Sequence, residues 1–277
     1  MTAVPVVIAL AAGLSATMTV AWLVALRSGR SSWIDAIWSF ATGGFGAAAA
    51  LAPIGGDVET STRQVLVAIL ALAWSLRLGL HIAVRAARGG DDPRYKQLRE
   101  EWGRSFKRRL FWFLQIQALA ALALVLSIQL AAHNPAPDLG LSDWIGLAVL
   151  IVAILGETAA DRQLAAFRSD PANKGKVCDV GLWGLSRHPN YFFEWLGWLA
   201  YPIIAIGLSG AHPWGWLALA GPLLMYWLLV HASGIPPLEA HMLRSRGAAF
   251  RAYQRRVNAF LPGPRRSATA RNEGDLR

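Results

Sequence analysis

Four residues that could do chemistry lie within eight positions of one another, where a polar loop turns into an apolar run. They are Arg187, His188, Asn190 and Glu194, in the stretch GLWGLSRHPNYFFEWLGW. Pro189 is typical of the first position of a helix, so the pattern predicts a helix that begins there with Ser186 or His188 as its cap. The free backbone N–H groups and positive dipole end of such a helix can receive an anion. Asn190 and Glu194 are four residues apart and would share one face of this helix.

A second polar pattern lies upstream of this block. Glu157, Asp161, Leu164 and Arg168 follow the spacing i, i+4, i+7, i+11 and would form one stripe on a helix. Lys174 and Lys176 follow in SDPANKGKV, a basic stretch suited to phosphate groups. A basic loop is also what membrane topology alone predicts. The chain has no glycine motif of the Rossmann or P-loop kind, so the spacing alone does not establish a nucleotide site.

The composition indicates what kind of elements must position these residues. Of 277 residues, 55% are hydrophobic and 13 are Trp, and the mean hydropathy is +0.36. These values are typical of a polytopic, all-α membrane protein. We therefore interpret the net charge of +10 as the topological bias of such a protein and not as a nucleic-acid surface. A single cysteine, Cys178, excludes an intrachain disulfide.

Seven apolar runs are long enough, or nearly so, to cross a bilayer core of ~30 Å as helices. They lie at about 4–26, 33–54, 64–84, 109–132, 142–160, 190–208 and 213–231. The odd-numbered loops and the C-terminal region hold 25 of the 27 Lys and Arg residues. The positive-inside rule then predicts a seven-helix bundle with its N-terminus outside, and with these loops and its C-terminus in the cytoplasm. Gly43, Gly44 and Gly46 leave open that the second run is a broken helix.

The region after the last run should form a C-terminal cytoplasmic helix, or a pair of helices broken near Gly247. It carries Glu239, His241, Arg246 and Tyr253. Two interpretations remain open, an amphipathic helix that lies in the membrane interface and a lid over a bound cofactor. We expect residues 1–263 to form a single membrane domain and residues 264–277 to form a disordered cytoplasmic tail.

Polar residues within the apolar runs gather in the half nearest the cytoplasm. They are Asp35, Arg77, His81, Gln115, Gln117, Glu157, Asn190 and Glu194. Ionisable groups in a membrane are costly unless paired or hydrated, and a cavity open to the cytoplasm would explain them together. The alternative is that they reach the interface or form pairs that orient the bundle, such as Asp35 with Arg77.

Three stretches carry a resemblance to a known family. GLWGLSRHPNYFFEWLGW, the upstream DRQLAAFR and the terminal EAHMLRSRGAAFRAYQRRVNAFLP resemble the C-terminal domain of the steroid 5-alpha-reductase family, in particular its bacterial members. The resemblance is strongest from Glu157 to Pro262. WIDAIWSF and DDPRYKQLREEWG also resemble segments of these bacterial members.

The resemblance implies a seven-helix NADPH-dependent reductase in a bacterial inner membrane. Such an enzyme would saturate the carbon–carbon double bond of a 3-keto-4-ene steroid, or a similar apolar enone, that enters from the lipid. Motif matches imply cofactor contacts for Asp161, Arg168, Asn190, Glu194, Glu239, Arg246 and Tyr253. We expect Lys174, Lys176, Arg187, His188 and Tyr191 to complete the NADPH site.

The N-terminal half departs from the animal members of the family, which place a Gln-Glu pair and a Tyr around the substrate ketone. WIDAIWSF leaves Asp35 as the nearby acid, and Trp74 occupies the tyrosine position when Arg77 is aligned with the family's arginine. Hydride addition to an enone builds negative charge on the carbonyl oxygen, which needs a donor. We expect catalytic roles for Asp35, Trp74 and His81, with the donor supplied by Asp35, if burial keeps it protonated, or by His81.

Two other function classes remain open. Isoprenylcysteine carboxyl methyltransferases share an RHP-x-Y element and a C-terminal Glu but bind S-adenosylmethionine, and they usually have fewer spans. A non-catalytic lipid-binding or transport bundle would need no dinucleotide site, and its polar residues should continue across to the outer leaflet. The expected partners are membrane lipids and an apolar substrate, with neither a metal nor a nucleic acid.

Overall fold

A computed structural model describes residues 3–54, 59–89 and 92–266. These residues form helices and no strand, apart from a single parallel bridge between Ser186 and Asn258. The chain divides into two compact units. The first unit comprises residues 1–148 and 199–221, and the second comprises residues 149–198 and 222–277.

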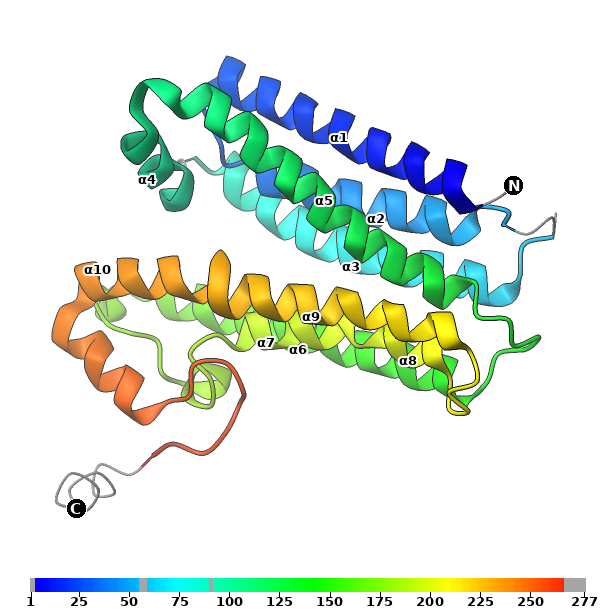
Figure 1. Cartoon of the computed structure of the whole chain (residues 1–277). Coiled ribbons are helices and arrows are strands. Elements are labelled where there is room, and N and C mark those ends of the chain that lie inside the picture. Colours follow the sequence, from blue (N-terminus) through cyan, green and yellow to red (C-terminus); the bar gives the residue numbers. More distant parts are fainter. Residues whose placement is uncertain (1–2, 55–58, 90–91, 267–277) are drawn as a thin grey trace, which may run out of the picture. The chain divides into compact units, whose positions relative to one another are not determined.

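Four long helices build the first unit. They are α1 (Ala3–Ser28), α2 (Ile34–Leu51), α3 (Thr62–Ala87) and α5 (Phe106–Ala132). Helix α2 packs against α1, α3 and α5, and α1 packs against α5 (Figure 1). The apolar positions follow a helical period, and the core they form includes Leu10, Leu14 and Met18 of α1 with Leu110, Leu114 and Ala118 of α5.

Helix α2 is continuous across the glycines that left a break open, and one of them allows a close approach to α3. A Cβ atom at Gly43 would lie 2.0 Å from the Cβ of Ser75. The Ser75 hydroxyl donates to the backbone oxygen of Ser39 at 2.9 Å across the same contact. Small residues and a hydroxyl that bonds between helices are typical of packing inside membranes.

The segment between α3 and α5, expected only as a basic loop, contains the short helix α4 (Pro93–Trp102). Pro93 occupies the first turn, and the Asp92 side chain accepts a hydrogen bond from the Arg94 backbone N–H. Gly103, with a φ of 47°, ends α4, and the turn η1 (Gly103–Ser105) leads into α5. This helix brings Arg94 and Tyr95 to the start of α2.

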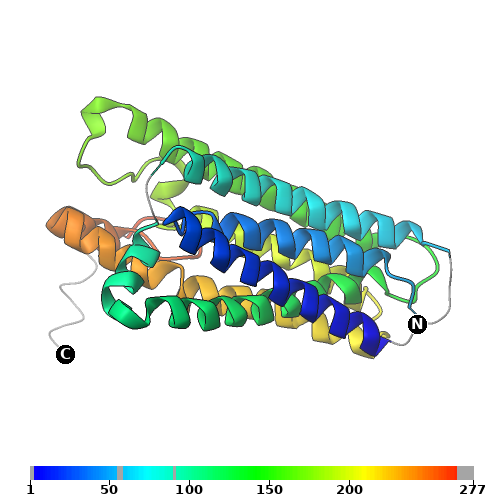
Figure 2. The same ribbon diagram turned by 90° about the horizontal axis from the view of Figure 1, so that it is seen from above.

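The second unit is built around the long helix α6 (Leu141–Ser169), which begins in the first unit. The shorter helices are α7 (Pro189–Trp198), α9 (Ala220–Trp227) and α10 (Ile235–Arg256), with a π-helical turn η5 (Leu228–Ala232) between the last two. Figure 2 shows them from a second direction. Gly156 of α6 faces the ring of Phe193 in α7, and the Trp195 indole donates to the Pro222 oxygen in α9 at 3.1 Å.

Two boundaries in this unit confirm predictions from the sequence. Helix α7 begins at Pro189, and α10 is interrupted at Gly247, where φ is 48° and ψ is −116°. Glycine adopts this positive φ without the steric cost that a Cβ atom would impose. Beyond α10, residue 266 lies close to the C-terminal end of this helix, where the Arg266 N–H donates a hydrogen bond to the Arg256 backbone oxygen at 2.9 Å. The rest of the tail expected at 264–277 lies outside the described residues.

Six helices of the described chain are long and apolar enough to cross a membrane, which makes this an integral membrane protein. The run expected at 190–208 is not among them. It forms α7 and α8 (Ala200–Ile206), which are separated at Leu199. Pro202 has no N–H to donate to the carbonyl of Trp198 four residues earlier, which accounts for the break. The seventh run contains the 3-10 turn η4 (Pro213–Leu219), α9 and η5.

A buried ion pair fastens the first unit at the opposite end from α4. Arg63 and Asp143 are 4% and 1% exposed, with Nε and Oδ1 2.8 Å apart and Nη2 and Oδ2 3.1 Å apart. The same guanidinium donates to the backbone oxygens of Asn134, Ala136 and Asp138. All five of its N–H groups are therefore used to fold the 134–143 connection onto the start of α3.

Asp143→Asn should lower the free energy of unfolding by about 3 to 5 kcal/mol, because it leaves the buried charge of Arg63 without its partner. Thermal unfolding of the purified protein in detergent measures this effect. Asp138→Asn is the matched control, since the Asp138 side chain is exposed and only its backbone oxygen contacts Arg63. Equal melting temperatures for the two variants would contradict the assigned role.

Candidate functional site

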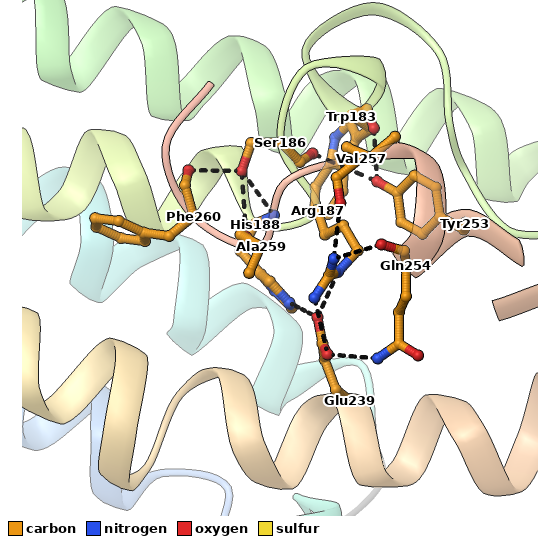
Figure 3. A network of polar contacts seen from close by, with 10 residues as sticks. All are labelled: Trp183, Ser186, Arg187, His188, Glu239, Tyr253, Gln254, Val257, Ala259 and Phe260. Atoms are coloured by element: carbon orange, nitrogen blue, oxygen red, sulfur yellow. Dashed lines mark hydrogen bonds and ion pairs between the residues drawn. The ribbon is translucent and has the colours of Figure 1, made fainter. Parts of the chain in front are cut away.

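Three segments that are far apart in the sequence meet in the second unit. They are the loop 181–188, helix α10 and the C-terminal segment 257–263. Figure 3 shows the side chains and backbone groups that join them. We call this set the junction network, and it comprises Trp183, Ser186, Arg187, His188, Glu239, Tyr253, Gln254, Val257, Ala259 and Phe260.

The loop is first held against α6. The buried Trp183 indole donates to the Ala160 oxygen at 2.9 Å, and the Leu182 N–H donates to the Gln163 side chain at 2.9 Å. Gly181 has a φ of 56°, and a Cβ atom there would lie 2.6 Å from Oε1 of Gln163. A glycine is needed at this turn for both reasons, and it directs the chain toward Ser186.

Glu239 is the centre of the junction network. Its carboxylate accepts from Arg187 Nε at 2.7 Å and Nη2 at 3.2 Å, from His188 Nε2 at 2.9 Å and from Gln254 Nε2 at 2.7 Å. The Glu239 and Arg187 side chains are only 13% and 12% exposed. A carboxylate this far from water is stable because a bidentate guanidinium and two further donors surround it.

Arg187 and its neighbour Ser186 fasten the C-terminal segment. Arg187 Nη1 donates to the backbone oxygens of Gln254 at 3.2 Å and Val257 at 2.7 Å, and its own N–H donates to Asn258 at 2.8 Å. The Ser186 hydroxyl donates to the Phe260 oxygen at 2.8 Å and accepts from the His188 N–H at 3.1 Å. Four of the five side-chain donors of Arg187 are thus occupied within the protein.

Tyr253 closes the same network from α10. Its hydroxyl donates to the Trp183 oxygen at 2.6 Å, and its ring packs with Phe250 and Val257 in a small apolar cluster. Tyr253 is 2% exposed. Its role in the described structure is therefore to hold α10 against the loop 181–188.

His188 differs from the other members because half of its hydrogen-bonding capacity is unused. Nε2 contacts Glu239, but Nδ1 is buried and has no hydrogen-bond partner in the part of the chain that the structure describes. The imidazole is 3% exposed and stacks on the Tyr191 ring with centroids 5.5 Å apart and planes 12° apart. Burial lowers the pKa of His188 and outweighs the hydrogen bond that His188 donates to Glu239, which acts to raise the pKa.

The two polar patterns of the sequence meet beside this network. Asn190 Nδ2 of α7 lies 3.4 Å from Oδ1 of Asp161 in α6, within hydrogen-bond distance. Glu194 is 5% exposed and accepts from the Trp198 indole at 3.0 Å. Arg168, Lys174 and Lys176 are exposed, while Arg246 is half-buried. The expected cofactor residues therefore divide into a buried or half-buried group, which includes His188, Asn190 and Glu194, and an exposed basic group.

The first unit holds a separate polar cluster around Asp35. Its carboxylate accepts from the Tyr95 hydroxyl at 3.0 Å and forms an ion pair with Arg94. Gln117 Nε2 donates to the Tyr95 hydroxyl at 3.4 Å, and Tyr95 is 2% exposed. Arg94 also donates a hydrogen bond to Asp92. Burial acts to raise the pKa of Asp92, but the hydrogen bonds and the charge of Arg94 outweigh burial and lower this pKa.

Sequence reasoning did not assign a role to Arg94 or Tyr95. Both lie in DDPRYKQLREEWG, which the sequence marks only by its resemblance, and a pair of Asp35 with Arg77 is one of the alternatives that the sequence leaves open. The helical start Asp-Pro at residues 92 and 93 could have indicated that Tyr95 lies on a helix. Of the other expected catalytic residues, Trp74 is 3% exposed in α3 and His81 is exposed on the same helix.

The described residues contain no group of three or more His, Cys, Asp or Glu side chains arranged to hold a metal ion. Ser186 and Gln254 also join the network, although the sequence indicated Ser186 only as a helix cap and gave no signal for Gln254. Ser186 contacts the C-terminal segment, and Gln254 contacts Glu239 across the interruption of α10 at Gly247, and no local pattern of the sequence connects either pair.

Arg187→Lys should loosen the C-terminal segment, because a lysine cannot make the bidentate contact with Glu239 and also reach two carbonyl oxygens. We expect backbone amides of residues 250–263 to exchange with solvent on the order of tenfold faster. Hydrogen exchange followed by mass spectrometry measures this. Arg251→Lys makes the same change at an exposed position of α10 and should leave the exchange unchanged.

Comparison with known proteins gives the family of the chain. The family model described as "Protein of unknown function (DUF1295)" matches residues 21–257. The chain is also similar to "Uncharacterized protein C594.04c" of Schizosaccharomyces pombe (strain 972 / ATCC 24843), with 25% identity over 271 residues that cover 88% of this chain and 76% of the relative. No solved structure matches the chain. Since the family model covers well over half of the sequence, the chain belongs to the DUF1295 family.

Proposed function

We propose that this protein is an NADPH-dependent reductase that saturates the carbon–carbon double bond of an apolar enone, such as a 3-keto-4-ene steroid. The observation that carries the proposal is the contact between Asn190 and Asp161. It joins the sequence RHPNY at residues 187–191, which we call the RHPNY block, to the stripe on α6. These are two stretches for which the resemblance to steroid 5-alpha-reductases implies cofactor contacts. The DUF1295 family includes steroid 5-alpha-reductase-like proteins, which supports the same reading.

The residues of the second unit fit a dinucleotide in two ways. The half-buried Asp161 and Asn190 offer polar groups of the kind that bind a nucleoside. So does the buried Nδ1 of His188, which has no hydrogen-bond partner among the described residues. Arg168, Lys174 and Lys176 offer exposed cationic side chains that suit phosphate groups. When bound, the cofactor would supply the hydride.

Tyr95 is the group that we propose as the donor to the substrate carbonyl. Both oxygens of Asp35 accept hydrogen bonds, one from Tyr95 and one from Arg94, so the proton in this cluster lies on the tyrosine. Asp35 and Gln117 orient the Tyr95 hydroxyl, which can turn its hydrogen bond to a ketone oxygen as negative charge develops there. Asp35 then acts through Tyr95 and not as the acid itself.

We also propose that α7 and α8 together make a seventh membrane crossing, and that the loop 181–188 and α10 face the cytoplasm of a bacterial cell. The basic residues of these segments support that orientation by the positive-inside rule. NADPH would then bind from the cytoplasm, while an apolar substrate would enter from the lipid.

NADPH should raise the melting temperature of the purified protein in detergent, while S-adenosylmethionine should not. Arg168→Ala should weaken NADPH binding about tenfold, because it removes a cation that pairs with phosphate. Arg162→Ala removes a neighbouring exposed arginine of α6 and serves as the control. Stabilisation by S-adenosylmethionine alone would instead support a methyltransferase of the isoprenylcysteine carboxyl methyltransferase type.

Tyr95→Phe should lower kcat for enone reduction by about 10²- to 10³-fold and leave NADPH binding unchanged, because it removes the proposed donor to the carbonyl. Product analysis with progesterone or testosterone and NADPH gives the rate. Tyr226→Phe makes the same change at a partly exposed residue and should retain activity. Equal rates for the two variants would reject Tyr95 as the donor.

A further inference from the structure

We propose that Glu239 is a positioning residue that fixes the tautomer of His188, so that Nδ1 presents a lone pair to a hydroxyl or amide N–H of the bound nucleoside. The inference rests on the proposed function in one respect, that the ligand of the second unit is a nucleotide cofactor. In this inference the RHPNY block contacts the sugar or the base of the cofactor, and other residues bind the phosphates of the cofactor.

The tautomer follows from the chemistry of the partner. A carboxylate has acceptors only, so the 2.9 Å contact between His188 Nε2 and Glu239 Oε1 requires the proton to lie on Nε2. Glu239 is already paired with Arg187 and bonded by Gln254, so its charge is balanced without a second cation. Burial, which lowers the pKa of His188, also favours the neutral ring. In a neutral ring with its proton on Nε2, Nδ1 has no proton.

The surroundings of Nδ1 indicate what it can bind. Buried polar atoms in folded proteins nearly always have a partner, and this one has none among the described residues. A bare lone pair accepts a hydrogen bond, so it suits a hydroxyl, an amide or an ammonium group and does not suit a phosphate oxygen. Stacking on Tyr191 and the bond to Glu239 hold the ring plane, so the direction of the lone pair is fixed.

A neighbouring pair has the same preference. Asp161 of α6 supplies carboxylate oxygens, and Asn190, two residues after His188 in the chain, supplies an amide that contacts this carboxylate. Carboxylates accept from ribose hydroxyls and from exocyclic amines, whereas they repel phosphates. The acceptors of Asp161 and His188 together favour the nucleoside part of a dinucleotide.

Nitrogen NMR of the full-length protein in detergent, labelled with ¹⁵N in its histidine rings, tests the inference directly. His188→Gln assigns the signals of His188. We expect a proton-bearing Nε2 and a bare Nδ1, and we expect the Nδ1 signal to move toward the hydrogen-bonded position when NADPH is added. Glu239→Gln should give a mixture of tautomers, since an amide can both donate and accept.

Binding measurements complete the test. His188→Gln keeps an N–H that can reach Glu239 but lacks the lone pair of Nδ1, so NADPH affinity should fall about tenfold while the melting temperature of the free protein is retained. His241→Gln makes the same change at an exposed position of α10 and should have no effect.

The outcomes separate this inference from the reductase proposal. A bare Nδ1 whose signal responds to S-adenosylmethionine but not to NADPH would support the assignment of His188 and reject the reductase. A proton on Nδ1 would overturn the inference whichever cofactor binds. So would a bare Nδ1 whose signal is unchanged by NADPH, S-adenosylmethionine and adenosine.

Discussion

The second unit depends on one carboxylate, that of Glu239. Four hydrogen bonds from three residues meet on it, and the donors come from two parts of the fold: Arg187 and His188 from the loop 181–188, and Gln254 from the far half of α10. Removing a carboxylate from water is costly unless its charge is paired and its lone pairs are occupied. The network meets both requirements, which is why it can lie at 13% exposure and still join segments that have no sheet or continuous helix between them.

The same rule governs two acids of the first unit. Asp143 is paired with Arg63, and Asp35 with Arg94, in both cases with an arginine from another helix. Arginine suits this role because its planar group can bond a carboxylate and backbone carbonyls at once, as Arg63 and Arg187 both do. Some arginines of this basic chain therefore hold helices together. The large number of arginines is thus not explained by the positive-inside rule alone.

The sequence predicted elements better than partners. Local signals were sufficient for the start of α7 at Pro189 and for the interruption at Gly247, because a proline ring and a glycine act through their own backbone. The break at Leu199 was missed, although Pro202 could have indicated it, because the apolar run continues through it. The helical spacing of Asp161 and the first turn of α7 correctly predicted polar faces, and their contact in the second unit follows from those faces. The partners of Asp35 and Glu239 could not be predicted, because they depend on how separate segments fold back.

This distinction also changes how the RHPNY block is interpreted. By charge alone, Arg187 was the residue best suited to an anion, yet its donors are largely used to hold α10 and the segment 257–263. His188 beside it carries less charge, and its buried Nδ1 has no hydrogen-bond partner among the described residues. A cation that fastens the fold leaves its neutral neighbour oriented and available. In this network, a polar atom without a hydrogen-bond partner therefore indicates a ligand contact better than the formal charge of a side chain does.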